Sequence, residues 1–135
     1  MPCASFSAIL TNLDDIRSFV DQALQDLLVP ARAAGDVVQA VDEAATNIIL
    51  HGYDGQEGTL DVELERQGAA LVVRLRDQAP QFDPTTIPSP NISLGLEQRR
   101  PGGLGIYFIR QLMDRIRYST PAEGGNELTL VKQLS

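Results

Sequence analysis

Apolar residues recur along this chain with two different periods, and the change of period divides it into elements. Residues 13–28 carry apolar side chains at helical spacing, and Pro30 closes that segment. A second helix is predicted from about residues 34–36 to Gly52, with glycines marking a turn after it. Ahead of both helices, residues 5–10 alternate weakly and predict a short strand.

A two-residue period follows. Residues 59–66 place Leu60, Val62 and Leu64 on one face with acidic residues between them, and residues 70–76 repeat the alternation after a Gln67-Gly68 turn. This arrangement predicts a β-hairpin. A long proline-rich loop then covers residues 77–100. Beyond it the pattern predicts a helix over residues 104–113 and two strands, over residues 115–119 and 127–133.

The order of these elements is helix, helix, two strands, loop, helix, two strands. It predicts an α/β (α+β) two-layer sandwich, in which helices cover one face of a mixed, largely antiparallel sheet. A length of 135 residues fits one domain, 1–135, with room for a real core.

Charge and composition exclude several classes of protein. Eleven basic residues stand against 18 acidic ones, a net charge of −7, which argues against a broad basic face for nucleic acid. No apolar run approaches the length that spans a bilayer, so we expect no membrane segment. The start of the chain lacks a secretory signal, and Cys3 is the single cysteine, so a cytoplasmic protein is expected.

A polar stripe lies on the second predicted helix. Gln39, Glu43, Asn47 and His51 recur every four residues, which stacks an amide, a carboxylate, a second amide and an imidazole. Such groups hold a metal ion or orient a nucleophile, but a polar stripe is also how a helix faces solvent. Spacing alone leaves these two interpretations evenly balanced.

Two further motifs flank the long loop. Asp77 directly follows a strand and enters a turn, where it is either a turn cap or a carboxylate at a pocket floor that accepts hydrogen bonds from an exocyclic amino group. Gly102, Gly103 and Gly105, with Leu104 between them, open the third helix. Glycines at a helix start let phosphate approach the backbone amides, although they also permit close helix packing. No Gly-Lys-Ser/Thr follows, so this is not a Walker A loop.

Together these three motifs, in this order, resemble the GHKL ATPases, and most closely the small anti-sigma-factor serine kinases of the RsbW and SpoIIAB type. The stretch from Glu43 to Tyr53 matches their N box, and the Asp77 turn stands where their first glycine box belongs. The glycine run at residues 103–105 matches the second glycine box. The resemblance covers nearly the whole chain and implies a Bergerat, histidine-kinase-like ATPase fold.

The resemblance also implies a role for each matching position. Asn47 would coordinate the Mg²⁺ that bridges the phosphates of ATP, and Glu43 would act as general base or orient the attacking hydroxyl. Asp77 would read the adenine amino group, with Ala79 and Phe82 in the same nucleotide-binding loop. Residues 85–102 would form a lid. The further positions expected at the ATP or ADP are Arg99 or Arg100 as lid cation, and Gly102, Gly103, Leu104 and Gly105 at the phosphates.

The implied function is an ATP-dependent serine/threonine kinase that phosphorylates a serine on an anti-anti-sigma protein of the STAS type, sequesters a sigma factor, or does both. A homodimer is possible, with the first helix as a contact surface. The sequence departs from the family pattern at three places. Ala79 and Gln81 replace the glycines of the first box, the lid has no lysine, and Gly125-Asn126-Glu127 replaces a common Gly-Thr before the last strand.

Two other functions remain open at this point. The altered first box motivates a binding module that holds nucleotide or none and acts by sequestering its partner. A detached catalytic domain of a histidine kinase is disfavoured, because no phosphoacceptor-helix segment precedes the predicted fold.

Overall fold

One five-stranded sheet forms one layer of the computed structural model, which describes residues 1–86 and 103–134. Its order is β1-β2-β3-β5-β4, and every neighbouring pair is antiparallel. The strands are β1 (Cys3–Ser7), β2 (Thr59–Gln67), β3 (Ala70–Asp77), β4 (Arg115–Ser119) and β5 (Asn126–Gln133). The hairpin predicted around Gly68 is confirmed as the β2–β3 pair.

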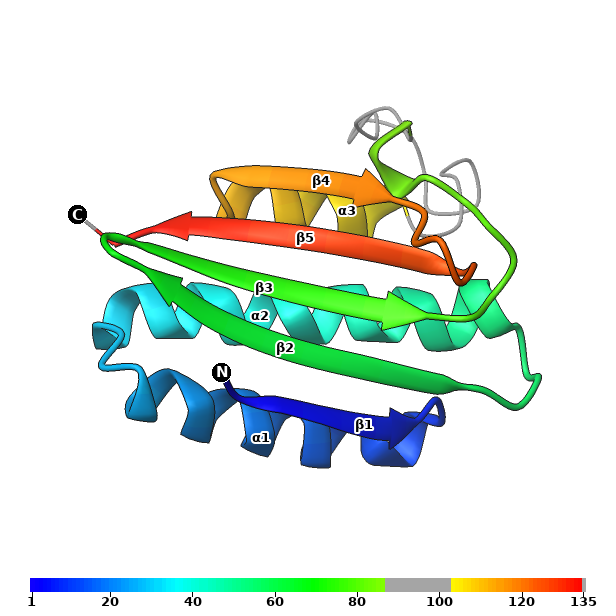
Figure 1. The fold of residues 1–135 in the computed structure, drawn as a ribbon, viewed down its shortest axis with the longest axis horizontal. Helices are drawn as coiled ribbons and strands as arrows, with labels where there is room; N and C mark the ends of the chain where they lie inside the picture. The colour runs from blue at the N-terminus through cyan, green and yellow to red at the C-terminus, as the bar shows by residue number, and fades with distance from the viewer. Residues whose placement is uncertain (87–102, 135) are drawn as a thin grey trace.

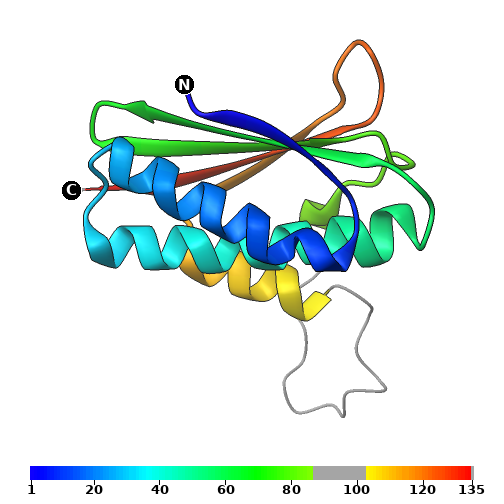
Figure 2. The same ribbon diagram turned by 90° about the horizontal axis from the view of Figure 1, so that it is seen from below.

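Three helices form the second layer. They are α1 (Leu13–Asp26), α2 (Ala31–Asn47) and α3 (Gly103–Leu112), and all lie on the same face of the sheet (Figures 1 and 2). Short turns, η1 (Leu10–Asn12) and η3 (Pro84–Thr86), precede α1 and follow β3. The predicted α+β two-layer sandwich is therefore confirmed.

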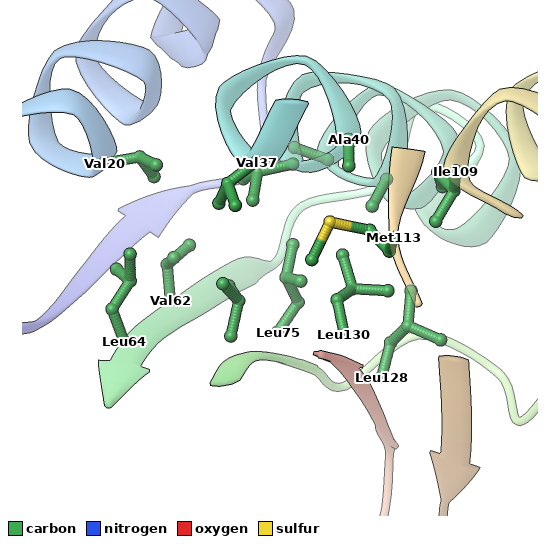
Figure 3. Packing of buried hydrophobic residues seen from close by; sticks show 14 of the residues in the cluster. Val20, Val37, Ala40, Val62, Leu64, Leu75, Ile109, Met113, Leu128 and Leu130 are labelled. Carbon is green, nitrogen blue, oxygen red and sulfur yellow. The ribbon is translucent and has the colours of Figure 1, made fainter. Parts of the chain in front are cut away.

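The core lies between the two layers. Leu60, Val62 and Leu64 of β2 are fully buried, as their alternation predicts. Figure 3 shows Leu75 and Leu130 of the central strands pointing at the same space as residues of α2 and at Met113, which directly follows α3. Side chains on the opposite face of the sheet are charged and paired across strands. Arg74 pairs with Glu63 at 2.8 Å and Arg76 with Glu127 at 2.7 Å.

Element boundaries differ from the predicted ones at the N-terminal half. The first strand spans Cys3–Ser7 instead of residues 5–10, because Ala8 turns away from it and Leu10 already begins η1. The second helix starts at Ala31, directly after Pro30. The first helix has already ended at Asp26, and Leu28 adopts a left-handed conformation, so Pro30 marks the start of α2, where proline is well tolerated.

The end of α2 also differs from a simple helix. The predicted helix to Gly52 is α-helical only to Asn47, and a π-helical turn, η2 (Ile48–Tyr53), continues it. Asp54 then adopts a left-handed conformation that ends the segment. None of the helices within residues 1–86 and 103–134 is long and apolar enough to cross a membrane.

Candidate functional site

A cavity of about 600 Å³ opens beside the end of the sheet where β3 stops and β5 begins. It lies between the C-terminal end of α2 with η2, the loop that follows β3, and the first turn of α3. Residues from each element line it: Asn47, His51, Asp77, Phe82, Ile106 and Asn126. The three motifs singled out in the sequence therefore meet at one place.

Asp77 lies at the floor of this cavity and is only 5% exposed. Its Oδ1 accepts hydrogen bonds from the backbone N–H of Ala79 at 2.9 Å and from Nδ2 of Asn126 at 2.8 Å. Its Oδ2 accepts none from the part of the chain that the structure describes. Burial raises the pKa of the Asp77 carboxyl, and the two hydrogen bonds act in the opposite direction. A buried acceptor without a partner, on a residue that lines a cavity, suits a ligand that donates a hydrogen bond.

Asn126 joins Asp77 from the facing strand. The two residues are directly paired in the β3–β5 register, and Asn126 is 8% exposed. Its Oδ1 accepts from the backbone N–H of Phe82 and from the hydroxyl of Tyr118, while its Nδ2 also faces the carbonyl of Ala79 at 3.2 Å. One amide thus holds the loop after β3 against β4 and β5.

Tyr53 fixes the same loop from the other side. Its hydroxyl accepts from the backbone N–H of Gln78 at 2.7 Å and donates to the carbonyl of Thr59 at 2.7 Å. The ring also packs in a small apolar cluster with Ala79 and Ile49. The methyl group of Ala79, which departs from the glycine of the family pattern, is therefore part of this cluster while it lines the cavity.

The polar stripe of α2 does not face a single site. Asn47 lines the cavity, whereas Gln39 lines a separate groove between α1 and α2. An α-helix has 3.6 residues per turn, so each four-residue step rotates by about 40° and a four-residue stripe winds around the axis. Gln39 therefore lies away from the cavity that Asn47 lines.

Glu43 lies one turn before Asn47 and is half-buried, outside the residues that line the cavity. Burial, and secondarily the neighbouring charge of Asp42, raises the pKa of its carboxyl. A raised pKa makes the carboxylate a better proton acceptor, as a general base requires. His51 is exposed at the rim of the cavity, on the π-helical turn.

The remaining predicted residues lie around the cavity mouth or outside the description. The ring of Phe82 is exposed and lines the cavity. The third helix begins at Gly103, one residue before the predicted start, and Ile106 in its first turn is buried against the cavity. Gly103, Leu104 and Gly105 thus form the beginning of α3. Arg99, Arg100, Gly102 and most of the expected lid, residues 87–102, lie outside the described residues.

The donor set around Asn47 fits a magnesium ion that arrives with phosphates. Residues 1–86 and 103–134 contain no cluster of three or more His, Cys, Asp or Glu side chains that could hold a metal alone. Mg²⁺ typically takes one or two protein oxygens and completes its shell with water and substrate phosphates. An amide oxygen from Asn47 beside an open cavity meets that requirement.

Asn126, Tyr118 and Tyr53 were not among the residues that the sequence marks as functional. The only sequence signal for Asn126 is its place in a family pattern that commonly has threonine. Tyr53 ends the stretch that resembles the N box, but neither its pattern nor that of Tyr118 indicates that the hydroxyl groups bind the backbone of Gln78 and the amide of Asn126.

The fold and this cavity define a class of protein. It is a two-layer α+β domain in which a buried carboxylate, Asp77, at the end of a central strand lines the same cavity as Asn47 of α2. Residues 6–132 match the family model described as the histidine kinase-like ATPase domain. The chain belongs to that family.

Named relatives refine this placement. The chain is 29% identical over 101 residues to the serine/threonine-protein kinase BtrW of Bordetella bronchiseptica, covering 74% of this chain and 70% of the relative. It is 26% identical over 97 residues to an anti-sigma F factor of Clostridium kluyveri, covering 72% and 68%. The resemblance to this group of kinases and anti-sigma factors is thereby confirmed.

A solved structure supports the fold. The crystal structure of the RsbU and RsbW domains of Rv1364c from Mycobacterium tuberculosis superposes with a TM-score of 0.64 at 19% identity. The match covers 99% of this chain and 32% of that one.

Proposed function

We propose that this protein is an ATP-dependent serine/threonine kinase of the anti-sigma-factor type. The observation that carries the proposal is the buried Asp77, whose Oδ2 is without a partner among the described residues, at the floor of a cavity that Asn47 also lines. The names of the relatives, a serine/threonine-protein kinase and an anti-sigma factor, support the class of activity.

Each residue has a task that its position suits. Asp77 accepts a hydrogen bond from the amino group of adenine, and Phe82 and Ala79 lie beside the base. Asn47 supplies an oxygen ligand to Mg²⁺. When bound, this ion neutralises charge on the ATP phosphates. The N-terminal amides of α3, from Gly103 to Gly105, approach the phosphates with the positive end of the helix dipole.

Glu43 orients the attacking hydroxyl of the acceptor and takes up its proton. Phosphoryl transfer depends mainly on positioning the reactants and on neutralising the negative charge that is distributed over the phosphate oxygens. One base and a few fixed hydrogen-bond donors are the kinds of group that this requires. The acceptor that we propose is a serine on an anti-anti-sigma protein of the STAS type, and a sigma factor is the second proposed partner. Arg99 or Arg100 would add a cation from the lid.

Transfer of labelled phosphate from ATP with Mg²⁺ to the STAS-type partner tests this function. Glu43→Gln is expected to slow transfer by about 10²-fold while ATP affinity stays within a few-fold. Asp36→Asn is a matched control, because it removes a carboxylate from the same helix at a residue that pairs with Lys132. Equal transfer by Glu43→Gln and wild type would remove Glu43 from the chemistry.

A second function is a binding module that acts by sequestering its partner. Two observations favour it: Glu43 does not line the cavity, and Ala79 stands in place of a glycine. Calorimetry with ATP and ADP, beside the transfer experiment, separates the two functions. Nucleotide binding without phosphoserine would support the module, and no heat at millimolar nucleotide would remove ATP from both accounts.

A further inference from the structure

The amide of Asn126 is fixed in one orientation. Its Oδ1 receives two donors, the backbone N–H of Phe82 at 3.0 Å and the hydroxyl of Tyr118. Flipping the amide would turn its NH₂ group toward the backbone N–H of Phe82, which can only donate, and would turn its oxygen toward three acceptors, Asp77 Oδ1 and the carbonyls of Ala79 and Pro80. The NH₂ group therefore points at Asp77 Oδ1, with the carbonyls of Ala79 and Pro80 at 3.2 and 3.3 Å.

This orientation determines what Asp77 offers to a ligand. Two N–H groups, from Ala79 and Asn126, occupy Oδ1 and favour the ionised carboxylate. Oδ2 is then an acceptor only. A purine with an amino group at position 6 brings a donor to it. A purine with a keto group at position 6 would place the lone pairs of its oxygen against those of Asp77 Oδ2, which leaves both buried acceptors without a donor.

Little else near Asp77 would keep it ionised. No salt bridge joins it to a cation of residues 1–86 or 103–134, and the facing elements contribute Leu60 of β2, Asn47 of α2 and Ile106 of α3. The titratable group that faces it from β4 is Tyr118, whose pKa is raised by burial first and then by the charges of Asp83 and Asp77. Further along the cavity, Tyr53, His51, Asp54 and Glu57 contribute from η2 and the turn after it.

We propose that Asn126 is a specificity-determining residue, whose amide commits Asp77 to accepting hydrogen bonds and thereby selects a 6-amino purine over a 6-keto purine. The proposal rests on the nucleotide binding proposed above and deepens it. Without the amide, a carboxyl buried in apolar surroundings holds its proton more readily and can donate from Oδ2 to a keto oxygen. Asn126 acts through Asp77 and does not itself touch the base.

Dissociation constants for ATP and for inosine triphosphate, which carries the keto group, test this inference. For the wild type we expect inosine triphosphate to bind roughly 10- to 100-fold more weakly than ATP. The variants Asn126→Thr and Asn126→Val introduce side chains of almost the same shape, but only threonine carries a hydroxyl that can donate to Oδ1 of Asp77. We call the dissociation constant for inosine triphosphate divided by that for ATP the ratio. Asn126→Thr is expected to keep this ratio within about threefold of the wild-type value, and Asn126→Val to reduce it to below about three.

The ratio separates specificity from stability. Both nucleotides carry the same phosphates and meet the same His51, so these contributions cancel in it. The ratio is expected to depend on pH more strongly in Asn126→Val than in the wild type, because loss of the Asn126 hydrogen bond raises the pKa of the Asp77 carboxyl further. Thr129→Ser, on the opposite face of β5, is the control and should leave the ratio unchanged.

Three results would overturn the inference. The first is an unchanged ratio in Asn126→Val, whether or not both nucleotides bind more weakly by a common factor; the second is a lowered ratio in Asn126→Thr equal to that in Asn126→Val; the third is a lowered ratio in the control Thr129→Ser. If neither variant folds, Tyr118→Phe takes their place, since it removes one of the two donors that orient the amide and should lower the ratio two- to fivefold. An unchanged ratio there would count against the inference. Absence of ATP binding by the wild type would instead overturn the proposed function.

Discussion

At the scale of single residues, the site depends on one group, the Asp77 carboxyl, whose burial in the charged form costs folding free energy. Asp77 is a carboxyl at the end of β3 that folding buries, and burial raises its pKa. Its two hydrogen bonds, from Ala79 and Asn126, offset part of that cost. A residue that destabilises the fold in its ionised form is typical of a binding site, where it gains its remaining partner from the ligand.

Replacing Asp77 by asparagine should separate stability from binding. Asp77→Asn keeps an oxygen for Ala79 and Asn126 but turns an NH₂ group toward the cavity, where the amino group of adenine would meet a donor. We expect ATP affinity to fall by at least about 10²-fold. At pH 7 the free energy of unfolding should be equal to or above that of the wild type, because no buried charge remains. Calorimetry and urea unfolding measure the two effects.

The pH dependence of this variant follows from the sign of the shift. The folded-state pKa of Asp77 is raised, so its favourable contribution is present below its unfolded pKa, near 3.8, and is lost as pH rises through the folded pKa. The stability difference between Asp77→Asn and wild type should therefore shrink as pH falls from 7 toward 4. A difference that grows in that direction would show that Asp77 is stabilising as a carboxylate.

Residue roles were only partly readable from the sequence. Asp77 could be marked because it follows a clear strand and enters a turn, but its burial depends on α2 and β5, which lie far from it in the chain. Asn126 could be seen only as a departure from a family pattern. Its partners, Asp77 and Phe82, are 49 and 44 residues away, and no local pattern reports contacts at that distance.

At the scale of elements, strand alternation predicted the sheet well because burial and period coincide. The hairpin over β2 and β3 needed only Leu60, Val62 and Leu64 facing one layer. The end of α2 could not be predicted in the same way. A π-helical turn differs from an α-helical one by a single extra residue, and the sequence from Ile48 to Tyr53 carries apolar residues suited to either.

The turn between β4 and β5 gives an element-scale prediction. Gly125 has φ +79°, and a Cβ there would lie 2.0 Å from the backbone carbonyl oxygen of Asp77. Gly68 in the β2–β3 turn has φ +61° and open space around a Cβ. Alanine at either position pays for left-handed backbone, roughly 1–2 kcal/mol. Gly125→Ala should cost at least about 2 kcal/mol more than Gly68→Ala, because the clash displaces the turn or Asp77.

Urea unfolding of the two glycine variants measures this difference, and calorimetry measures its effect on the site. Gly68→Ala should leave ATP affinity unchanged, since its turn is at the opposite end of the sheet from the cavity (Figure 1). Gly125→Ala should weaken ATP binding as well as the fold. Equal losses of stability in both variants would mean that the approach of the turn to Asp77 has no consequence.

At the scale of the whole molecule, the core lies between the two layers and the candidate site lies at one end of the sheet. The three helices bury the apolar face of the sheet, and its other face carries charges paired across strands, such as Arg74 with Glu63. With a net charge of −7, the chain would bind the proposed anionic nucleotide through local donors and Mg²⁺. That residues 1–135 form one ATP-binding domain, and that a homodimer forms, stay predictions.

Ligand binding should therefore be visible in the stability of the whole chain. A nucleotide that binds only the folded state stabilises it by about 2.7 kcal/mol at 100 times its Kd. For a chain of 135 residues this corresponds to a rise in Tm of about 10 °C. Thermal unfolding with increasing ATP and Mg²⁺ should show one cooperative transition whose midpoint rises with the logarithm of the ATP concentration.

Asp77→Asn should show no rise, and Gly68→Ala should show the full rise from a lower starting point. A transition that splits in two, with only one part responding to ATP, would contradict a single ATP-binding domain, and an equal response in Asp77→Asn would place the nucleotide elsewhere.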